Sequence, residues 1–421
     1  MYQVKTIAPG VRAVGVKAKN FKTNVIDVEM ALPLNEKAAV NSVLINLLSK
    51  SSKEYPDLTV LNQKLDELYG ASLKTSIFKD GDAQIFSMKI TCLDDRFALE
   101  GEKITEECIE LLAGLIFNPN IKNGSFGKEN LTTEKRLLKN KILTEQDDKR
   151  AYALEKCIEL MCPNEPYGRS VNGTLEEVDA IRMTDVFAAW KELVATAVFQ
   201  ITVVGNITLA KAVKPFTAYF KDIDREPAAV ETVIYKKGQR FRRGVETSPV
   251  NQGKLVIGYR AGIEAKDENY YPIKVMTDIF GGGTYSKLFA NVREKMSLAY
   301  YCSARYIDSK GLVIVQSGID TEKEKEVSNA IVNQLNDIRN GKFDDELLEA
   351  SKRSFKESSN KNSPSAICSW YSSFILDEEI MTPEQDLEGY LKVTKEEVCE
   401  AAKNLAIDKI FMLQAEESGE N

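Results

Sequence analysis

The stretch Gly281–Tyr300, GGGTYSKLFANVREKMSLAY, is the part of this 421-residue chain that says most about its fold. Gly281, Gly282 and Gly283 open it, and glycine allows backbone conformations closed to other residues and a close approach of main chain to a ligand. The apolar spacing that follows predicts a helix over residues 285–295 and then a strand. A tight turn between two helices would equally explain the three glycines.

The elements around this stretch follow an order that occurs twice along the chain. In the first half we predict a strand over 24–32, helices over 37–48 and 58–68, strands over 72–78 and 84–92, helices over 96–116, 128–147 and 150–160, a strand over 199–204 and a helix over 209–220. In the second half we predict a strand over 254–259, helices over 270–280 and 285–295, strands over 298–306 and 311–318, helices over 322–340, 344–359, 363–375 and 395–405, and a strand over 410–414. The repeated order indicates two similar α+β halves.

The domain boundaries follow from this repeat. We expect an N-terminal half at residues 1–222, a linker at 223–253 and a C-terminal half at 254–421. The linker contains the basic run Lys236–Arg243, KKGQRFRR, which can be interpreted as a nucleic-acid patch or as a solvated linker. The run is short and lone and has no interleaved aromatic residue beyond Phe241, so the solvated linker is the better interpretation.

The composition of the chain limits the partners and the cellular compartment that we expect for it. The chain has 56 basic and 63 acidic residues, a net charge of −7, which argues against nucleic-acid and anionic-membrane partners. Residues 1–16 lack a basic cluster followed by an apolar core, and no apolar run approaches the length of a membrane span, so we expect neither signal peptide nor membrane. Seven cysteines, an odd number without a CxxC pair, are typical of reduced thiols. We therefore expect a cytoplasmic protein.

The chain contains no histidine. This excludes general acid–base catalysis by histidine, Ser-His and Cys-His nucleophile pairs, and every zinc site that needs imidazole. A serine or cysteine hydrolase is a poor hypothesis, because no base is available to activate the nucleophile.

Three segments together resemble the pitrilysin, insulysin and mitochondrial processing peptidase superfamily. The block Gly281–Tyr300 is similar to that superfamily's motif of a glycine-rich turn, a helix with Leu-Phe, then Arg-Glu-Lys and Leu-Ala-Tyr. Glu165–Val178, EPYGRSVNGTLEEV, resembles its Pro-Tyr-Gly segment, and Ile201–Asn206, ITVVGN, resembles the strand that closes the first half. The resemblance spans essentially the whole chain. It implies two structurally similar α/β-sandwich halves, each a mainly antiparallel sheet with helices packed on it.

The resemblance also locates the positions of a zinc site. The family binds zinc through His-x-x-Glu-His on one helix and a glutamate on a later helix. Here the motif falls on residues 42–46, SVLIN, so that Ser42 and Asn46 replace the histidines and Ile45 replaces the base. The third ligand position falls on Lys141, while Glu134 matches the family's accessory acid. A hydroxyl, an apolar chain, an amide and an ammonium do not bind zinc, so we expect no metal on this chain.

Other residues that the family uses are retained. The resemblance implies that Arg293 and Tyr300 match an arginine that orients substrate and a tyrosine that holds the developing oxyanion. It also implies that the glycine-rich loop lies at a substrate cavity. The alternative is that Arg293 is a surface residue at the end of a helix and Tyr300 a core aromatic residue on a strand. Tyr167, Gly168 and Gly173 are explained as turn residues.

Two functions remain compatible with these residues. The first is a non-catalytic subunit of a heteromeric zinc peptidase. It would bind peptide in a chamber shared with a homologous zinc-bearing chain, and it would supply Arg293 and Tyr300 in trans. Zinc would then belong to the partner chain, and a homodimer is possible where that partner is absent. The second is a scaffold or peptide-binding protein that has left proteolysis entirely. Retention of the Arg/Tyr pair favours the first.

Overall fold

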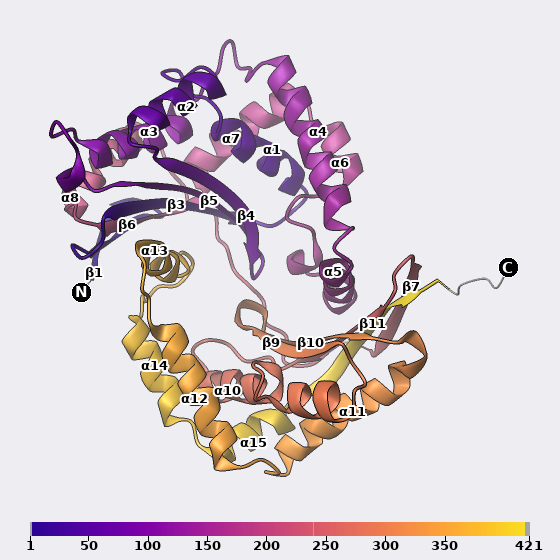
Figure 1. The fold of residues 1–421 in the computed structure, drawn as a ribbon. Helices are drawn as coiled ribbons and strands as arrows, with labels where there is room; N and C mark the ends of the chain where they lie inside the picture. Colours follow the sequence, from indigo (N-terminus) through magenta and orange to yellow (C-terminus); the bar gives the residue numbers. More distant parts are fainter. Residues whose placement is uncertain (1, 239, 417–421) are drawn as a thin grey trace. The chain divides into compact units, whose positions relative to one another are not determined.

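The computed structural model describes residues 2–238 and 240–416, and it divides them into two compact units with one β-sheet each (Figure 1). The first unit contains residues up to Ile142, then Arg169–Glu231 and Lys361–Ile380. The second contains Leu143–Gly168, Thr232–Asn360 and the described residues from Met381 onward. The predicted class is confirmed: the sheets are mostly antiparallel and have helices packed on them.

The sheet of the first unit has six strands in the order β1-β2-β6-β3-β5-β4. Its strands are β1 (Tyr2–Ala8), β2 (Val11–Lys17), β3 (Thr23–Pro33), β4 (Ser72–Asp80), β5 (Ala83–Leu93) and β6 (Val198–Gly205). Only the β2–β6 pair is parallel among these neighbours. The predicted hairpin is present as β4 and β5, and its turn contains Gly81 at φ 53°, a conformation that glycine adopts without steric cost.

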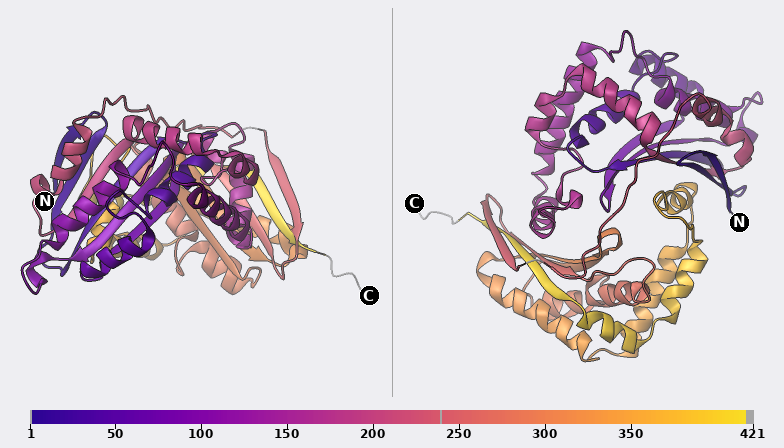
Figure 2. Two further views of the ribbon diagram at one scale, coloured as in Figure 1. Left: turned by 90° about the horizontal axis from the view of Figure 1, so that it is seen from above. Right: turned by 180° about the vertical axis from the view of Figure 1, so that it is seen from behind.

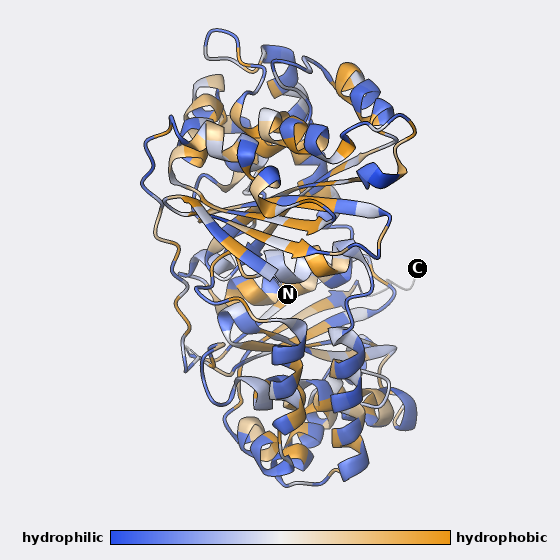
Figure 3. Ribbon diagram, turned by 90° about the vertical axis from the view of Figure 1, so that its left-hand side faces the viewer, coloured by the Kyte–Doolittle hydropathy of each residue, from blue (hydrophilic) through white to orange (hydrophobic). Residues whose placement is uncertain are grey.

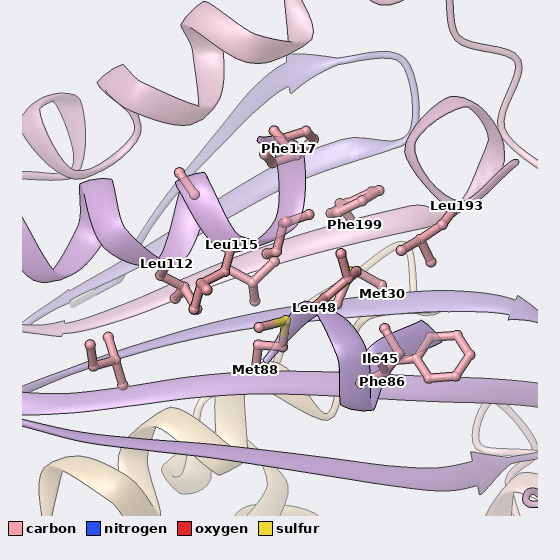
Figure 4. Packing of buried hydrophobic residues seen from close by; sticks show 14 of the residues in the cluster. Met30, Ile45, Leu48, Phe86, Met88, Leu112, Leu115, Phe117, Leu193 and Phe199 are labelled. Atoms are coloured by element: carbon pink, nitrogen blue, oxygen red, sulfur yellow. The ribbon is translucent and has the colours of Figure 1, made fainter. Parts of the chain in front are cut away.

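Helices cover both faces of this sheet. The helices of the unit are α1 (Ala38–Leu48), α2 (Leu58–Glu67), α3 (Ile104–Phe117), most of α4 (Lys128–Glu145), α6 (Leu175–Ala180), α7 (Met183–Thr196), α8 (Leu209–Ala212), α9 (Lys214–Phe220) and α13 (Pro364–Ser372). The large core lies between α1, α3 and α7 and one face of the sheet (Figure 4). There Met30 and Phe86 of the strands pack with Ile45 of α1, Leu112 of α3 and Leu193 of α7. Burial of each such side chain contributes about 1.5–3 kcal/mol.

The second unit has a five-stranded sheet in the order β7-β11-β8-β10-β9, in which only β7 and β11 run parallel. Its strands are β7 (Arg242–Ser248), β8 (Gly253–Arg260), β9 (Tyr301–Ile307), β10 (Leu312–Ile319) and β11 (Ala406–Ala415). Its helices are α5 (Lys149–Met161), α10 (Tyr270–Gly281), the π-helix η3 (Leu288–Lys295), α11 (Glu324–Arg339), α12 (Asp345–Ser359), α14 (Pro383–Lys392) and α15 (Lys395–Lys403). In Figure 3 hydrophobic stretches run along the central strands, and the helices carry both hydrophobic and hydrophilic residues.

Each half of the sequence contributes one segment to the compact unit formed mainly by the other half. Helix α13, from the second half of the chain, packs on the sheet of the first unit, where Cys368 meets Val25 and Val204. Helix α5, from the first half, packs on the sheet of the second unit, where Ile158 lies in one cluster with Phe411. The boundaries at residues 222 and 254 therefore mark halves of the sequence, whereas the compact units exchange one segment each.

Within the described ranges, no helix combines the length and apolar character that a membrane span requires. All seven cysteines are unpaired, and only Cys399 is not fully buried. Burial raises the pKa of the Cys157 thiol to about 12, which keeps it in the protonated form.

Candidate functional site

The first predicted metal position, Ser42, is a fully buried residue on α1. Its Oγ donates to the carbonyl oxygen of Val171 at 3.0 Å, and Gln84 Nε2 donates to the same oxygen at 2.7 Å. Gln84 Nε2 also lies 3.3 Å from Ser42 Oγ. Because a buried hydroxyl needs a partner, this network explains why serine is tolerated at a position where the family has an imidazole.

The next two positions on α1 have no metal-binding character. Ile45, which the resemblance aligns with the catalytic base, is a fully buried packing residue in the large apolar core of the first unit. Asn46 is half-buried, and its backbone carbonyl accepts a hydrogen bond from Ser49 Oγ at 2.9 Å.

Lys141, which the resemblance aligns with the third ligand, is an exposed residue of α4. Its Nζ donates to Asn172 Oδ1 at 3.4 Å, and Asn172 itself is buried. Val171 and Asn172 are neighbours in one short segment, and they accept hydrogen bonds from Ser42 and Lys141, respectively. Ser42 of α1 and Lys141 of α4 therefore contact adjacent residues of the same segment.

Segment 169–174 packs closely on the first turn of α1. Gly173 has φ +69°, and a Cβ atom there would lie 2.7 Å from the Cβ of Ala39. The side chain of Thr174 caps helix α6 through the Glu177 amide, and Arg169 pairs with the Glu177 carboxylate at 2.6 Å. Steric fit and capping account for Gly173, which agrees with its interpretation as a turn residue.

The accessory acid position is occupied by an ion pair. Glu134 on α4 is 3% exposed, and its carboxylate binds the ammonium of Lys50, which follows α1. No group of three or more cysteine, aspartate and glutamate side chains that could hold a metal ion occurs among the described residues. The donor set at the family's zinc positions does not fit zinc, and this chain binds none there.

Arg293 and Tyr300 lie on the second unit, and both are exposed. Arg293 is near the end of the π-helix η3, with its guanidinium 4.7 Å from the centre of the Phe289 ring and its Nε 3.3 Å from Glu294 Oε1. Tyr300 is 55% exposed, and its hydroxyl donates to Asp320 Oδ1 at 3.2 Å. The alternative of a core aromatic residue on a strand is wrong for Tyr300, because β9 begins one residue later and the ring faces solvent.

The backbone between these two residues is irregular. Apolar spacing predicts an ordinary helix over 285–295, but residues 288–295 form a π-helix, a turn type that occurs frequently at functional sites. Ser297 then adopts φ 51°, a left-handed conformation that costs a non-glycine residue about 1–2 kcal/mol. Sequence reasoning does not identify Asp320 as the partner of Tyr300, since twenty residues separate them and only the fold brings them together.

The three glycines serve close packing. A Cβ atom on Gly281 would lie 2.3 Å from the backbone nitrogen of Ala304, and one on Gly282 would lie 2.1 Å from Asp278 Oδ1. A Cβ on Gly283 would overlap the Tyr285 ring. None of the three has a positive φ, so the expected use of conformations closed to other residues is not what selects glycine here. Space selects it.

The sequence and the fold point to one class of protein, an M16-like peptidase fold without zinc ligands. Residues 180–355 match the family description "Peptidase M16 inactive domain". A protein of Bacillus subtilis named "Probable inactive metalloprotease YmfF" is 29% identical over 420 residues, 99% of this chain and 98% of that protein. An "Uncharacterized zinc protease" of Rickettsia bellii is 23% identical over 66% of this chain and 68% of that protein.

Solved structures agree with these sequence relatives. A conserved protein from Enterococcus faecalis V583 has a TM-score of 0.91 at 27% identity, covering 100% of both chains. A peptidase M16 inactive domain from Pseudomonas fluorescens has the same fold, with a TM-score of 0.82 at 18% identity over 99% of this chain and 97% of that one. The chain is therefore similar to M16 peptidases and, among them, to proteins named as inactive, and it contains no histidine with which to form their zinc motif.

Proposed function

We propose that this chain is the non-catalytic subunit of a heteromeric zinc peptidase. It binds peptide and supplies Arg293 and Tyr300 in trans to a homologous zinc-bearing chain. The observation that carries the proposal is the contrast between two groups of family positions. Ser42 and Ile45, at two of the metal-site positions, are fully buried, and Ser42 is held by a hydrogen bond to Val171, whereas Tyr300 is 55% exposed.

The chemistry of the exposed pair suits this role. A tyrosine hydroxyl stabilises a developing oxyanion by donating one hydrogen bond that strengthens in the transition state. The Tyr300 hydroxyl currently donates to Asp320 at 3.2 Å, a long and exposed bond that a stronger acceptor can replace. The planar donors of the Arg293 guanidinium can orient a peptide carbonyl or carboxylate.

The first unit offers a surface for an extended peptide. Strand β4 is the edge of its sheet beyond β5, and most of its residues are exposed. An exposed edge strand presents unpaired backbone groups to which an extended peptide can add. The proposal assigns peptide binding to this edge and transition-state contacts to the second unit. It also places the subunit in the cytoplasm, where seven unpaired cysteines stay reduced.

Association with the zinc-bearing homologue tests the proposal. We expect co-expressed chains to elute as one complex in size exclusion at micromolar concentration. Its buried interface should exceed the standard size of roughly 1,600 Å², because two chains of this size must enclose a substrate chamber. The complex should cleave peptide, and this chain alone should not. Two separate peaks, or a homodimer that ignores the homologue, would contradict the heteromer and favour a scaffold or peptide-binding protein without proteolysis.

A further inference from the structure

Strand β7, Arg242–Ser248, is an open edge of the second sheet. It pairs in parallel with β11 on one side, and among the residues that the structure describes no strand pairs with its other side. Figures 1 and 2 show it at the outer end of the sheet of its own unit. A seven-residue edge of this kind leaves alternate backbone N–H and C=O groups free to pair with another polypeptide.

The chain that enters β7 carries a dense positive charge. The five cations of this run are Lys236, Lys237, Arg240, Arg242 and Arg243. Within the described residues, only Arg243 has a carboxylate partner, Glu324 at the start of α11. The one acid of β7, Glu246, accepts a hydrogen bond from Tyr152 at 2.7 Å on the α5 face. The strip is therefore basic on a chain whose net charge is −7.

The side chains of β7 divide between two faces in the usual alternation. Gly244 and Glu246 face α5, because a Cβ atom on Gly244 would lie 2.6 Å from Leu160 Cδ1 and Glu246 binds Tyr152. Val245 consequently points to the opposite face, where it is 46% exposed. Phe241, at the entry to the strand, is 55% exposed. An added strand would thus find backbone groups, positive charge and two apolar contacts together.

We propose that β7 binds an extended acidic polypeptide segment, which adds to the sheet as a sixth strand. Free edge groups supply the backbone pairing, and the cations at the entry supply charge complementarity. A second copy of β7 is a poor occupant, because it brings the same excess of cations and its one acid, Glu246, is already bound by Tyr152. A nucleic acid is a poor occupant because it uses neither the free backbone groups of the strand nor the apolar side chain of Val245.

The neighbouring pocket does not carry the inference. A cavity of about 820 Å³ lies beside the start of β7, since Asp408 lines it and Lys409 pairs with Arg242. Its lining contains three cations, Lys236, Lys237 and Arg260, and three acids, Asp267, Glu268 and Asp408. With equal numbers of positive and negative side chains, the cavity favours neither an acidic nor a basic ligand. Arg240, Arg242 and Arg243, by contrast, do not line the pocket and leave an excess of positive charge at the strand edge, which lies on a different unit from the β4 edge used above.

The test uses the full chain and a fluorescent eight-residue peptide of alternating glutamate and valine, followed by anisotropy. We expect binding that weakens with added salt, because exposed ion pairs are screened. Two peptides separate the contributions. The same peptide N-methylated at alternate residues keeps its charge but cannot pair its backbone, and a lysine–valine peptide pairs but carries the wrong charge. Both should fail to bind.

Charge reversal then locates the site. Arg240→Glu/Arg242→Glu should weaken binding of the acidic peptide about tenfold or more and should permit binding of the lysine–valine peptide. Lys5→Glu, an exposed cation on the edge strand β1 of the other unit, is the matched control and should change neither. Equal binding of the N-methylated peptide, no loss in the double variant, or tighter binding of a single-stranded oligonucleotide would overturn the proposal. Since all substituted residues are exposed, each variant should keep the wild-type thermal unfolding curve.

Discussion

The ammonium of Lys50, just beyond helix α1, forms an ion pair with the buried carboxylate of Glu134 on α4. The resemblance places Glu134 at the family's accessory acid position, beside the helix of the former zinc ligands. Here the positive charge near this acid comes from a lysine of the chain itself. Charge balance at the degenerate site is therefore maintained without a metal.

Removal of Lys50 should destabilise the first unit. Lys50→Met leaves the Glu134 carboxylate buried without its counter-ion, and we expect a loss of about 1–3 kcal/mol in the free energy of unfolding. The expected loss lies below the range for fully buried pairs because the Lys50 side chain is 36% exposed. Urea unfolding at neutral pH measures the change.

Two variants control this experiment. Lys37→Met breaks an exposed pair with Glu192 and should cost less than about 1 kcal/mol. The double variant Lys50→Met/Glu134→Leu removes both charges and should recover much of the loss, because a buried pair can be replaced by apolar residues at little cost. Equal losses for Lys50→Met and Lys37→Met would show that the pair does not stabilise the site.

Glu29 makes the stability of the chain depend on pH. Burial is the largest cause, and the charge of Asp27 adds to it, so that the pKa of Glu29 rises to about 8 from its ordinary value of 4.5, although Lys89 opposes the shift. The folded state therefore binds a proton more tightly than the unfolded state. Stability should be greatest below about pH 4.5 as far as this group is concerned, and it should fall as pH rises to about 8.

Glu29→Gln should remove this dependence. The variant should lose less stability than the wild type between pH 5 and pH 8 in urea unfolding at several pH values. Glu36→Gln, an exposed acid of the same unit, is the control and should leave the wild-type slope unchanged. An identical slope in the Glu29 variant would mean that the carboxylate is ionised in the folded chain at neutral pH.

The glycine at the end of α10 should not tolerate a methyl group. Gly281→Ala places a Cβ atom 2.3 Å from the Ala304 nitrogen, and we expect a loss of about 1–3 kcal/mol from overpacking. Gly114 in α3 is the matched control, because a Cβ atom there meets nothing within 4 Å. Gly114→Ala should stabilise by about 0.5–1 kcal/mol through helix propensity. Thermal unfolding that moves both variants in the same direction would refute the steric explanation.

The sequence predicts the elements that have a strong local pattern. The helix expected over 37–48 is α1, and the strands expected over 24–32 and 254–259 are β3 and β8. The predictions of these elements succeed because apolar periodicity reflects the face that each element buries. The assignment of Ser42 and Lys141 to the metal positions stays a prediction, although the two residues form hydrogen bonds with neighbouring residues, Val171 and Asn172.

The elements without such a pattern are not predicted. Strand β7 falls in the expected linker, because an exposed and charged edge strand shows little apolar alternation. Strands β1 and β2 and helices α7 and α14 are likewise not predicted from the sequence. The start of α13 is encoded locally by Ser363 as N-cap and Pro364 at the first position, but nothing local states which sheet the helix covers. Likewise, apolar spacing does not distinguish the π-helix η3 from an ordinary helix.

The central claim concerns Tyr300 and assigns chemistry to a chain without a catalytic centre. Tyr300→Phe removes the hydroxyl and keeps the ring, so the variant should assemble normally with the zinc-bearing homologue. Loss of one oxyanion donor typically costs about 100- to 1,000-fold in turnover. Arg293→Ala should damage turnover and the Michaelis constant together, because it removes a cation that would also hold substrate.

The deciding measurement is steady-state kinetics on the reconstituted pair, with assembly checked for each variant by size exclusion. Tyr167→Phe is the control, since Tyr167 is a buried structural residue of the second unit. We predict that Tyr300→Phe lowers kcat about 100-fold or more with little change in KM, while Tyr167→Phe leaves kcat nearly unchanged. A Tyr300→Phe complex that assembles normally and turns over at the wild-type rate would contradict the role in trans and favour a scaffold.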